Sequence, residues 1–266
     1  MKKRIISAII MIIICVPIFI IGGNLYNIAI SLLAIFALKE FLDIKETKKK
    51  IPGFIKFISY VFLLMFLISN IGAPIKTFSM DYRIISGLFL SFLIPTILYH
   101  NRETYSINDA FYMIGGIFFL SLPMILFINV RLYSFMLMIY LVLIPIITDT
   151  FAYLTGMLVG KHKLLESISP KKTWEGTIGG SIFGTFVGVM YYITVINPNV
   201  NIFKIILITG FLSVLGQFGD LAFSAIKRYF GKKDFSNLIP GHGGILDRID
   251  SIIFILLGFM FFISII

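Results

Sequence analysis

Four polar side chains in the C-terminal part of this 266-residue chain recur at intervals that suit a catalytic or binding site. If one helix runs through the region, they recur at i, i+4, i+7 and i+8 and share one face. They are Asp220, Ser224, Lys227 and Arg228. A carboxylate is a natural ligand for a hard cation, and hydroxyl and cationic groups donate to phosphate oxygens. The stripe therefore predicts metal-assisted chemistry on a phosphate group.

A glycine-rich segment follows this stripe and contains Pro240, His242, Gly243 and Gly244. Proline and glycine disfavour a regular helix before about residue 244, and backbone N–H groups at the start of the next helix can bind an anion. His242 could donate to a phosphate, transfer a proton or only hydrogen-bond its own loop, and the sequence leaves these roles open. We expect a phosphate-binding turn ahead of the final helix.

Two acidic residues, Asp247 and Asp250, lie three positions apart in the first turn of that helix. They either ligate a cation or only complement the helix dipole. Asp149 and Asp220 each lie near the end of an apolar run, where an ionised carboxylate costs roughly 2.5 to 3.5 kcal/mol unless it is paired or hydrated. That cost favours a functional role, with capping or an interfacial position as the alternative.

A second basic segment, within residues 156–177, carries Lys171 and Lys172 beside hydroxyl groups and the single tryptophan. Basic cytoplasmic loops are common, so this pattern alone is weak. Along the apolar run that follows, glycine recurs at every fourth residue, which is typical of closely packed helices. The four glycines are Gly176, Gly180, Gly184 and Gly188.

The segments that carry these polar residues are mostly apolar. The chain is 58% hydrophobic and 14% charged, with a mean hydropathy of +0.99, which excludes an ordinary soluble protein. About 20 apolar residues are needed for a helix to cross a bilayer. Such runs, without the alternation of a β-barrel, predict an all-α, polytopic transmembrane helical bundle of about nine spans. The runs are 5–22, 27–43, 57–71, 84–99, 109–128, 133–152, 177–196, 203–223 and 250–266.

The basic residues orient this bundle, because Lys and Arg collect on the cytoplasmic side. With a cytoplasmic N-terminus and an outside C-terminus, 19 of the 23 basic residues lie inside, and only Lys76, Arg83, Arg131 and Lys204 lie outside. We expect the first run to be an uncleaved helix. Cys15 is the single cysteine, which excludes a disulfide within the chain. The net charge of +10 then indicates anionic lipid as a partner, and no nucleic acid.

The polar residues keep a fixed spacing over some 27 positions. They read Ser224-x-x-Lys227-Arg228, then Lys233-Asp234, then Pro240-x-His242-Gly243-Gly244-Ile245-x-Asp247-Arg248-Ile249-Asp250. This pattern resembles the signature of the CDP-diacylglycerol synthases, also called phosphatidate cytidylyltransferases. The similarity is strong over about residues 145–256, whereas the N-terminal half resembles the family only in hydropathy. Met157 and Phe223 depart from the usual pattern, which puts only secondary contacts in doubt.

The resemblance implies a CTP:phosphatidate cytidylyltransferase of phospholipid biosynthesis, with CTP and phosphatidic acid as substrates. It also implies dependence on Mg²⁺, with a second cation such as K⁺ as an option. By motif, Asp220 and Asp247 are the expected metal ligands, and Lys227 and Arg228 complete the catalytic set. The residues expected to bind substrate are Asp149, Lys171, Lys172, Ser224, Lys233, Asp234, His242, Gly243, Gly244, Arg248 and Asp250.

Two alternatives to this function stay open. An ion-coupled transporter would bind a cation through Asp149 and Asp220, but it would not need the basic, glycine-rich segment. A cytidylyltransferase acting on another lipid phosphate would need the same residues. We expect a bacterial inner membrane protein with a cytoplasmic active site, and a homodimer is one option for its assembly. The expected organisation is N-terminal helices over 1–107 and a catalytic domain over 108–266 with cytoplasmic loops 156–177 and 224–250.

Overall fold

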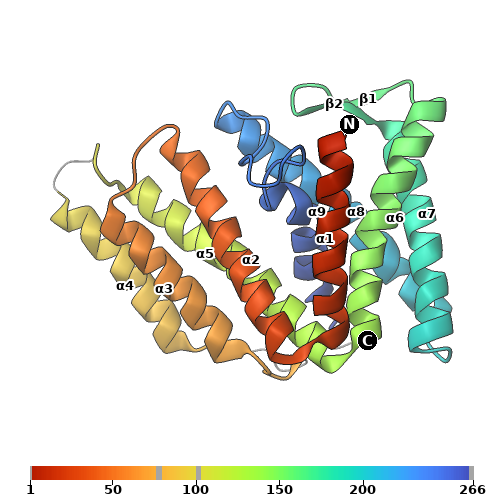
Figure 1. Cartoon of the computed structure of the whole chain (residues 1–266), viewed down its shortest axis with the longest axis horizontal. Coiled ribbons are helices and arrows are strands. Elements are labelled where there is room, and N and C mark those ends of the chain that lie inside the picture. Colours follow the sequence, from red (N-terminus) through yellow and green to blue (C-terminus); the bar gives the residue numbers. More distant parts are fainter. Residues whose placement is uncertain (1, 76–79, 100–102, 264–266) are drawn as a thin grey trace. The chain divides into compact units, whose positions relative to one another are not determined.

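The computed structural model describes residues 2–75, 80–99 and 103–263, and this part of the chain is mostly helical (Figure 1). Lys76 and the end of the predicted run 250–266 lie outside the described residues. The elements, in chain order, are α1 (Lys2–Ile21), α2 (Gly23–Glu46), α3 (Gly53–Asn70), α4 (Tyr82–Leu98), α5 (Ile107–Tyr133), α6 (Phe135–Val159), β1 (Lys163–Leu165), β2 (Ser169–Thr173), α7 (Trp174–Tyr191), the π-helical turn η2 (Tyr192–Ile196), α8 (Ile202–Tyr229) and α9 (Leu246–Phe259).

Each predicted apolar run coincides with one of these α-helices, which confirms a helical membrane protein. Within the described residues, six helical segments are long and apolar enough to cross a bilayer. They are α2, α3, α5, α6, α7 with η2, and α8. The apolar part of α1 and all of α4 are shorter, and α9 has 14 residues, or roughly 21 Å at the α-helical rise. Nine full spans and the orientation of the termini therefore stay predictions.

The helices form two compact units. The first contains Met1–Leu132 and Asp234–Leu246, and the second contains Tyr133–Lys233 and Asp247–Ile266. Most of α5 therefore belongs to the same unit as α1 to α4. The segment Asp234–Leu246, which leads into α9, also belongs to that unit. The expected division into N-terminal helices over 1–107 and a catalytic domain over 108–266 stays a prediction.

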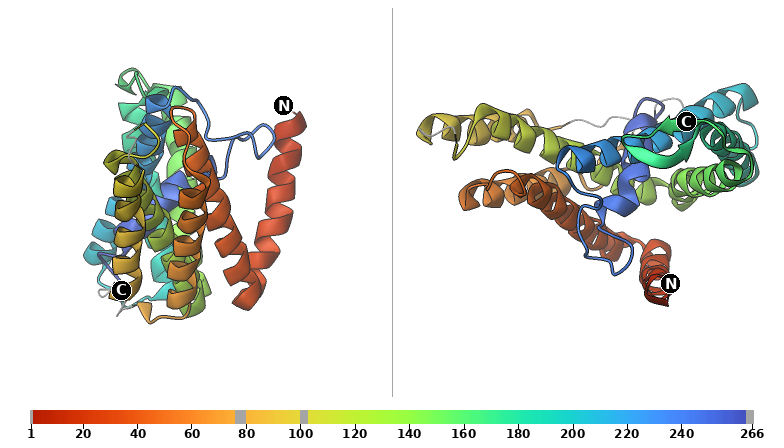
Figure 2. Two further views of the ribbon diagram at one scale, coloured as in Figure 1. Left: turned by 90° about the vertical axis from the view of Figure 1, so that its left-hand side faces the viewer. Right: turned by 90° about the horizontal axis from the view of Figure 1, so that it is seen from above.

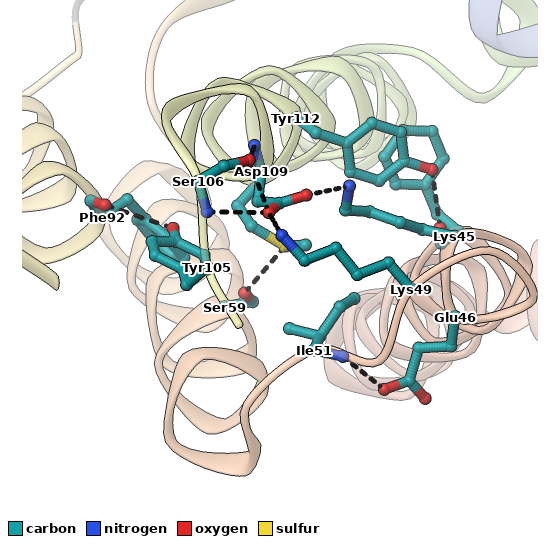
Figure 3. A network of polar contacts seen from close by, with 12 residues as sticks. Lys45, Glu46, Lys49, Ile51, Ser59, Phe92, Tyr105, Ser106, Asp109 and Tyr112 are labelled. Carbon is teal, nitrogen blue, oxygen red and sulfur yellow. Dashed lines mark hydrogen bonds and ion pairs between the residues drawn. The ribbon is translucent and has the colours of Figure 1, made fainter. Parts of the chain in front are cut away.

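In the first unit, an ion cluster links the end of α2 to the start of α5 (Figure 3). Asp109 accepts hydrogen bonds from Lys45 Nζ and Lys49 Nζ, each at 2.5 Å. It also accepts from the Ser106 hydroxyl at 2.7 Å and the Ser106 backbone N–H at 2.8 Å, in the manner of a capping box. The Lys45 ammonium lies 4.7 Å from the centre of the Tyr112 ring. A carboxylate that is 5% exposed needs such partners, so the cluster holds these two helix ends together.

In the second unit, α6 and α7 run side by side and pack through the predicted glycines (Figure 1). All four glycines are buried. A Cβ atom at Gly176 would lie 2.7 Å from the Ala152 carbonyl oxygen, and one at Gly180 would lie 2.6 Å from that of Thr148. The Thr148 hydroxyl also hydrogen-bonds the Ser213 hydroxyl of α8 at 2.7 Å. The predicted packing face along α7 is thus confirmed, and α8 joins α6 and α7 there.

Candidate active site

A two-stranded antiparallel hairpin, β1 and β2, lies in the basic segment between α6 and α7, where the sequence indicated only a loop. Glu175, in the first turn of α7, fastens its base by accepting from the backbone N–H groups of Lys161 and His162 and from His162 Nδ1 at 2.6 Å. Thr173 caps α7 through a bond from the Gly176 N–H to its hydroxyl. Strand β2 therefore leads directly into the packed helix α7. This connection restricts where Lys171 and Lys172 on β2 can lie.

Helices α8 and α9 approach closely at two glycines. A Cβ atom at Gly219 would lie 2.7 Å from the Asp250 carbonyl oxygen, and one at Gly216 would lie 2.9 Å from the Ile255 side chain. Phe223, one of the departures from the family pattern, is fully buried and packs edge to face on α9. This contact brings Asp220, which follows Gly219, close to the first turns of α9.

The first ion pair of the site joins the hairpin to α8. Lys172 Nζ lies 2.6 Å from Asp220 Oδ2, and the two side chains are 21% and 33% exposed. Ser224 Oγ lies 3.5 Å from Asp220 Oδ1, at the outer limit of a hydrogen bond. Because α8 runs unbroken to Tyr229, the predicted single-face stripe is confirmed for this helix.

The second ion pair joins α8 to α9 and is more deeply buried. Lys227 Nζ donates to Asp247 Oδ1 at 2.6 Å, and the two side chains are 10% and 4% exposed. Removal of one member of a buried ion pair leaves the charge of the other member uncompensated, which destabilises the fold. The structure therefore places Asp220 and Lys227 on α8 and connects Lys227 directly to Asp247 on α9.

Two further carboxylates lie within the electrostatic reach of these pairs. Asp149, exposed on α6, interacts with Lys172 and Asp220. Asp250, buried on α9, interacts with Asp220, Lys227 and Asp149. Asp149 and Asp250 therefore add two oxygen-bearing groups to the two lysine–carboxylate pairs.

Whether this cluster could hold Mg²⁺ depends on its donor atoms. Among the described residues, no set of three or more His, Cys, Asp or Glu side chains is arranged as a metal site. Mg²⁺, however, is usually bound by one or two carboxylates, with water and substrate phosphates as its other ligands. Asp220 and Asp247 fit this need because they offer oxygen atoms and already hold a cationic group at 2.6 Å.

Arg228, the fourth predicted catalytic residue, is directed to backbone oxygens. Its Nη1 donates to the Lys232 carbonyl at 2.9 Å, and its Nε donates to the Ile168 carbonyl at 3.4 Å. Arg228 therefore binds the chain just after the end of α8 and the turn between β1 and β2. Among the predicted phosphate-binding residues, Lys171, Lys233 and Arg248 are exposed.

The glycine-rich segment belongs to the first unit, together with Asp234, which is exposed. It forms a tight turn in which the His242 N–H donates to the Ile239 carbonyl and the Ile239 N–H to the Gly243 carbonyl, each at 2.9 Å. Gly241 and Gly243 have φ values of 80° and 85°, which favour glycine. The predicted interruption before α9 is thus confirmed.

The predicted anion site at the start of α9 is present, but a protein carboxylate fills it. The backbone N–H groups of Ile245 and Leu246 donate to the carboxylate oxygens of Glu40 at 2.9 and 2.8 Å. Glu40 is not among the predicted site residues, because it lies in the run 27–43, whose apolar residues indicate packing alone. Its charge inside a predicted span was the signal that could have identified it.

Comparisons with known proteins extend the family resemblance over the whole chain. The cytidylyltransferase family matches residues 2–266. The phosphatidate cytidylyltransferase of Staphylococcus haemolyticus is 37% identical over 257 residues, covering 96% of each chain. The protein of the same name from Staphylococcus aureus strain COL is 35% identical over 257 residues, also with 96% of each chain covered. The N-terminal helices, which resembled the family only in hydropathy, are therefore part of the match.

Proposed function

The chain belongs to the cytidylyltransferase family, and we propose that it transfers the cytidylyl group of CTP to phosphatidate, giving CDP-diacylglycerol and pyrophosphate. The observation that carries the proposal is the pair of carboxylate–lysine contacts, the partly exposed Lys172–Asp220 and the buried Lys227–Asp247, which join β2, α8 and α9. Relatives named phosphatidate cytidylyltransferase, 35% and 37% identical, support this choice of substrate.

In the proposed reaction, a phosphate oxygen of phosphatidate forms a bond to the α-phosphorus of CTP, and the bond from that phosphorus to the β-phosphate oxygen breaks. The lipid phosphate is already anionic near neutral pH, so the reaction needs no general base. Both substrates are negatively charged, so alignment and charge neutralisation account for most of the catalysis. A catalytic base at His242 is therefore unnecessary.

The lysines of the cluster can exchange partners during this reaction. Lys172 and Lys227 each hold a carboxylate at 2.6 Å, and an arriving phosphate offers their ammonium groups another anion. Asp220 and Asp247 would then be released to hold Mg²⁺. The chemistry that Mg²⁺ supplies when bound is neutralisation of charge on the triphosphate. A second cation such as K⁺, sharing these carboxylates, is part of the same proposal.

We also propose that the site faces the cytoplasm of a bacterial cell, where CTP and Mg²⁺ are available. The distribution of basic residues supports a cytoplasmic N-terminus, and the family match lies with bacterial proteins. Phosphatidate would then reach the site sideways, from the inner leaflet of the bilayer.

The test is an assay with purified protein, labelled CTP, Mg²⁺ and phosphatidate in mixed micelles, scored for lipid-soluble label. Parallel reactions contain a polyprenyl phosphate in place of phosphatidate. Product with phosphatidate is the expected result, and product with only the other lipid would assign the alternative substrate. Folded protein that gives no labelled lipid, but moves ions in vesicles without CTP, would establish the transporter instead.

A further inference from the structure

The carboxylate of Glu40 is buried and fully engaged by a distant segment of the chain. Glu40 is 3% exposed, although its neighbour Lys39 is exposed on α2. Its Oε1 atom accepts from the Ser236 hydroxyl at 2.6 Å and the Ile245 N–H at 2.9 Å, and its Oε2 accepts from the Leu246 N–H at 2.8 Å. An ionised group at this depth needs such donors, so the contact is specific.

Gly244 shows how closely the carboxylate fits the start of α9. This glycine is buried, and a Cβ atom at its position would lie 2.5 Å from both carboxylate oxygens of Glu40. The oxygens therefore occupy the space that a side chain would fill. They also meet the positive end of the helix dipole, which stabilises a negative charge there. Glu40 thus caps α9 from a different helix.

A second contact holds the same segment at α1, toward which the loop extends in Figure 2. Ser7 Oγ donates to the Pro240 carbonyl at 3.0 Å and lies 2.8 Å from His242 Nδ1. A hydroxyl group has one hydrogen, so the bond to Pro240 requires His242 Nδ1 to be the donor in the second contact. The segment before α9 is therefore fixed from two helices, with Glu40 at its end.

We propose that Glu40 is a positioning residue for the transfer reaction, acting through the first turn of α9. Its bonds to Ile245 and Leu246 set where the helix begins, and Asp247 is the next residue of that turn. The inference rests on the proposed role of Asp247 in holding Mg²⁺. It assigns to the N-terminal helices a part in the reaction without any contact to substrate.

The main test compares Glu40→Gln with Glu46→Gln in the purified, full-length protein. Glu46 is on the same helix and pairs with Lys56, with side chains 23% and 33% exposed. The amide of Glu40→Gln directs an NH₂ group at a backbone donor, which breaks the cap. Metal affinity is read directly from Mn²⁺ titration by electron paramagnetic resonance, and the Mg²⁺ concentration for half-maximal rate is measured beside it.

We expect Glu40→Gln to weaken Mn²⁺ binding about 10-fold or more, the range typical for residues that orient metal ligands. The Mg²⁺ requirement should rise by a similar factor while KM for CTP changes less, and Glu46→Gln should match the parent protein. Folded Glu40→Gln with unchanged Mn²⁺ affinity would overturn the proposal.

Two further variants keep the test decisive if Glu40→Gln does not fold. Ser236→Ala removes one of the three hydrogen bonds, and Gly244→Ala places a methyl group against the carboxylate. Each should weaken Mn²⁺ binding, and parental affinity in both would overturn the inference. Metal binding that depends on Glu40 in a protein that makes no CDP-lipid would support positioning and refute only the proposed reaction. A parent protein that binds no Mn²⁺ would refute the metal role and the positioning role together.

Discussion

Buried carboxylates are held in different ways in the two units. In the first unit, Glu40 accepts two hydrogen bonds from backbone N–H groups, and Asp109 is enclosed by two lysines and Ser106. In the second unit, Asp220 and Asp247 each pair with the end of a long lysine side chain. Backbone donors cannot leave, whereas a lysine can turn from a carboxylate to a phosphate. The difference distinguishes Glu40, which backbone donors hold in place, from Asp220 and Asp247. Asp109 is also held by lysines, so its role has to be tested by substitution.

Asp247→Asn should give the largest effect, because it removes charge from the exchangeable group that is 4% exposed. We expect the rate of CDP-lipid formation to fall roughly 100-fold or more, the scale of a lost electrostatic group in an active site. Initial rates over a range of Mg²⁺ concentrations, before and after treatment with a chelator, measure this loss. A variant that works at the parental rate would remove Asp247 from the metal site.

Asp109→Asn tests the other side of the comparison. Breaking a buried ion pair costs about 3 to 5 kcal/mol of stability, because the lysines lose their counter-charge. We expect a lower temperature of unfolding in detergent, and the fraction that stays folded should keep the parental Mg²⁺ dependence. Asp109→Glu is the control that retains the charge. An altered Mg²⁺ requirement in folded Asp109→Asn would mean that this cluster also serves the reaction.

Lys172→Ala should lower the reaction rate much more than it lowers the stability of the fold. Its pair with Asp220 is partly exposed, so the stability lost should be about 1 kcal/mol or less. The rate should nevertheless fall about 10-fold or more, since the ammonium group is expected to bind a phosphate. Thermal unfolding and initial rates on one preparation give both values. Lys171→Ala, on the same exposed strand, is the matched comparison.

Lys56→Ala should have the smallest effect of the set. Lys56 pairs with Glu46 at 2.5 Å, but both side chains reach solvent, and such pairs contribute between 0 and about 1 kcal/mol. We expect unchanged rates and an unfolding temperature within a degree or two of the parent. A large loss of activity would show that the first unit also contains exchangeable charges.

The predictable parts of this molecule are those with local periodicity. Apolar runs located every helix, and the spacing from Asp220 to Lys227 predicted a single helical face that α8 confirms. The glycine repeat along α7 predicted close packing for the same reason. In each case neighbouring residues act together on one element, so the sequence contains the whole signal.

The parts that could not be predicted depend on partners distant in sequence. Residue types in the signature indicated a cation site, but not that Lys172 would hold Asp220 or Lys227 would hold Asp247. The hairpin was missed because strands of three and five residues are too short for a period of two to be visible. Glu40 was missed because its donors lie in another segment, and no local pattern connects them.

The cap on α9 also has a consequence for the order of biosynthesis. Glu40 and its three donors are separated by 196, 205 and 206 residues, so α2 is made long before its partners. At a translation speed of about 5 to 20 residues per second, this interval is roughly 10 to 40 seconds. During that time the nascent chain contains an uncapped carboxylate within an apolar helix. A chain that ends before residue 236 therefore lacks all three groups that donate to Glu40 in the finished protein.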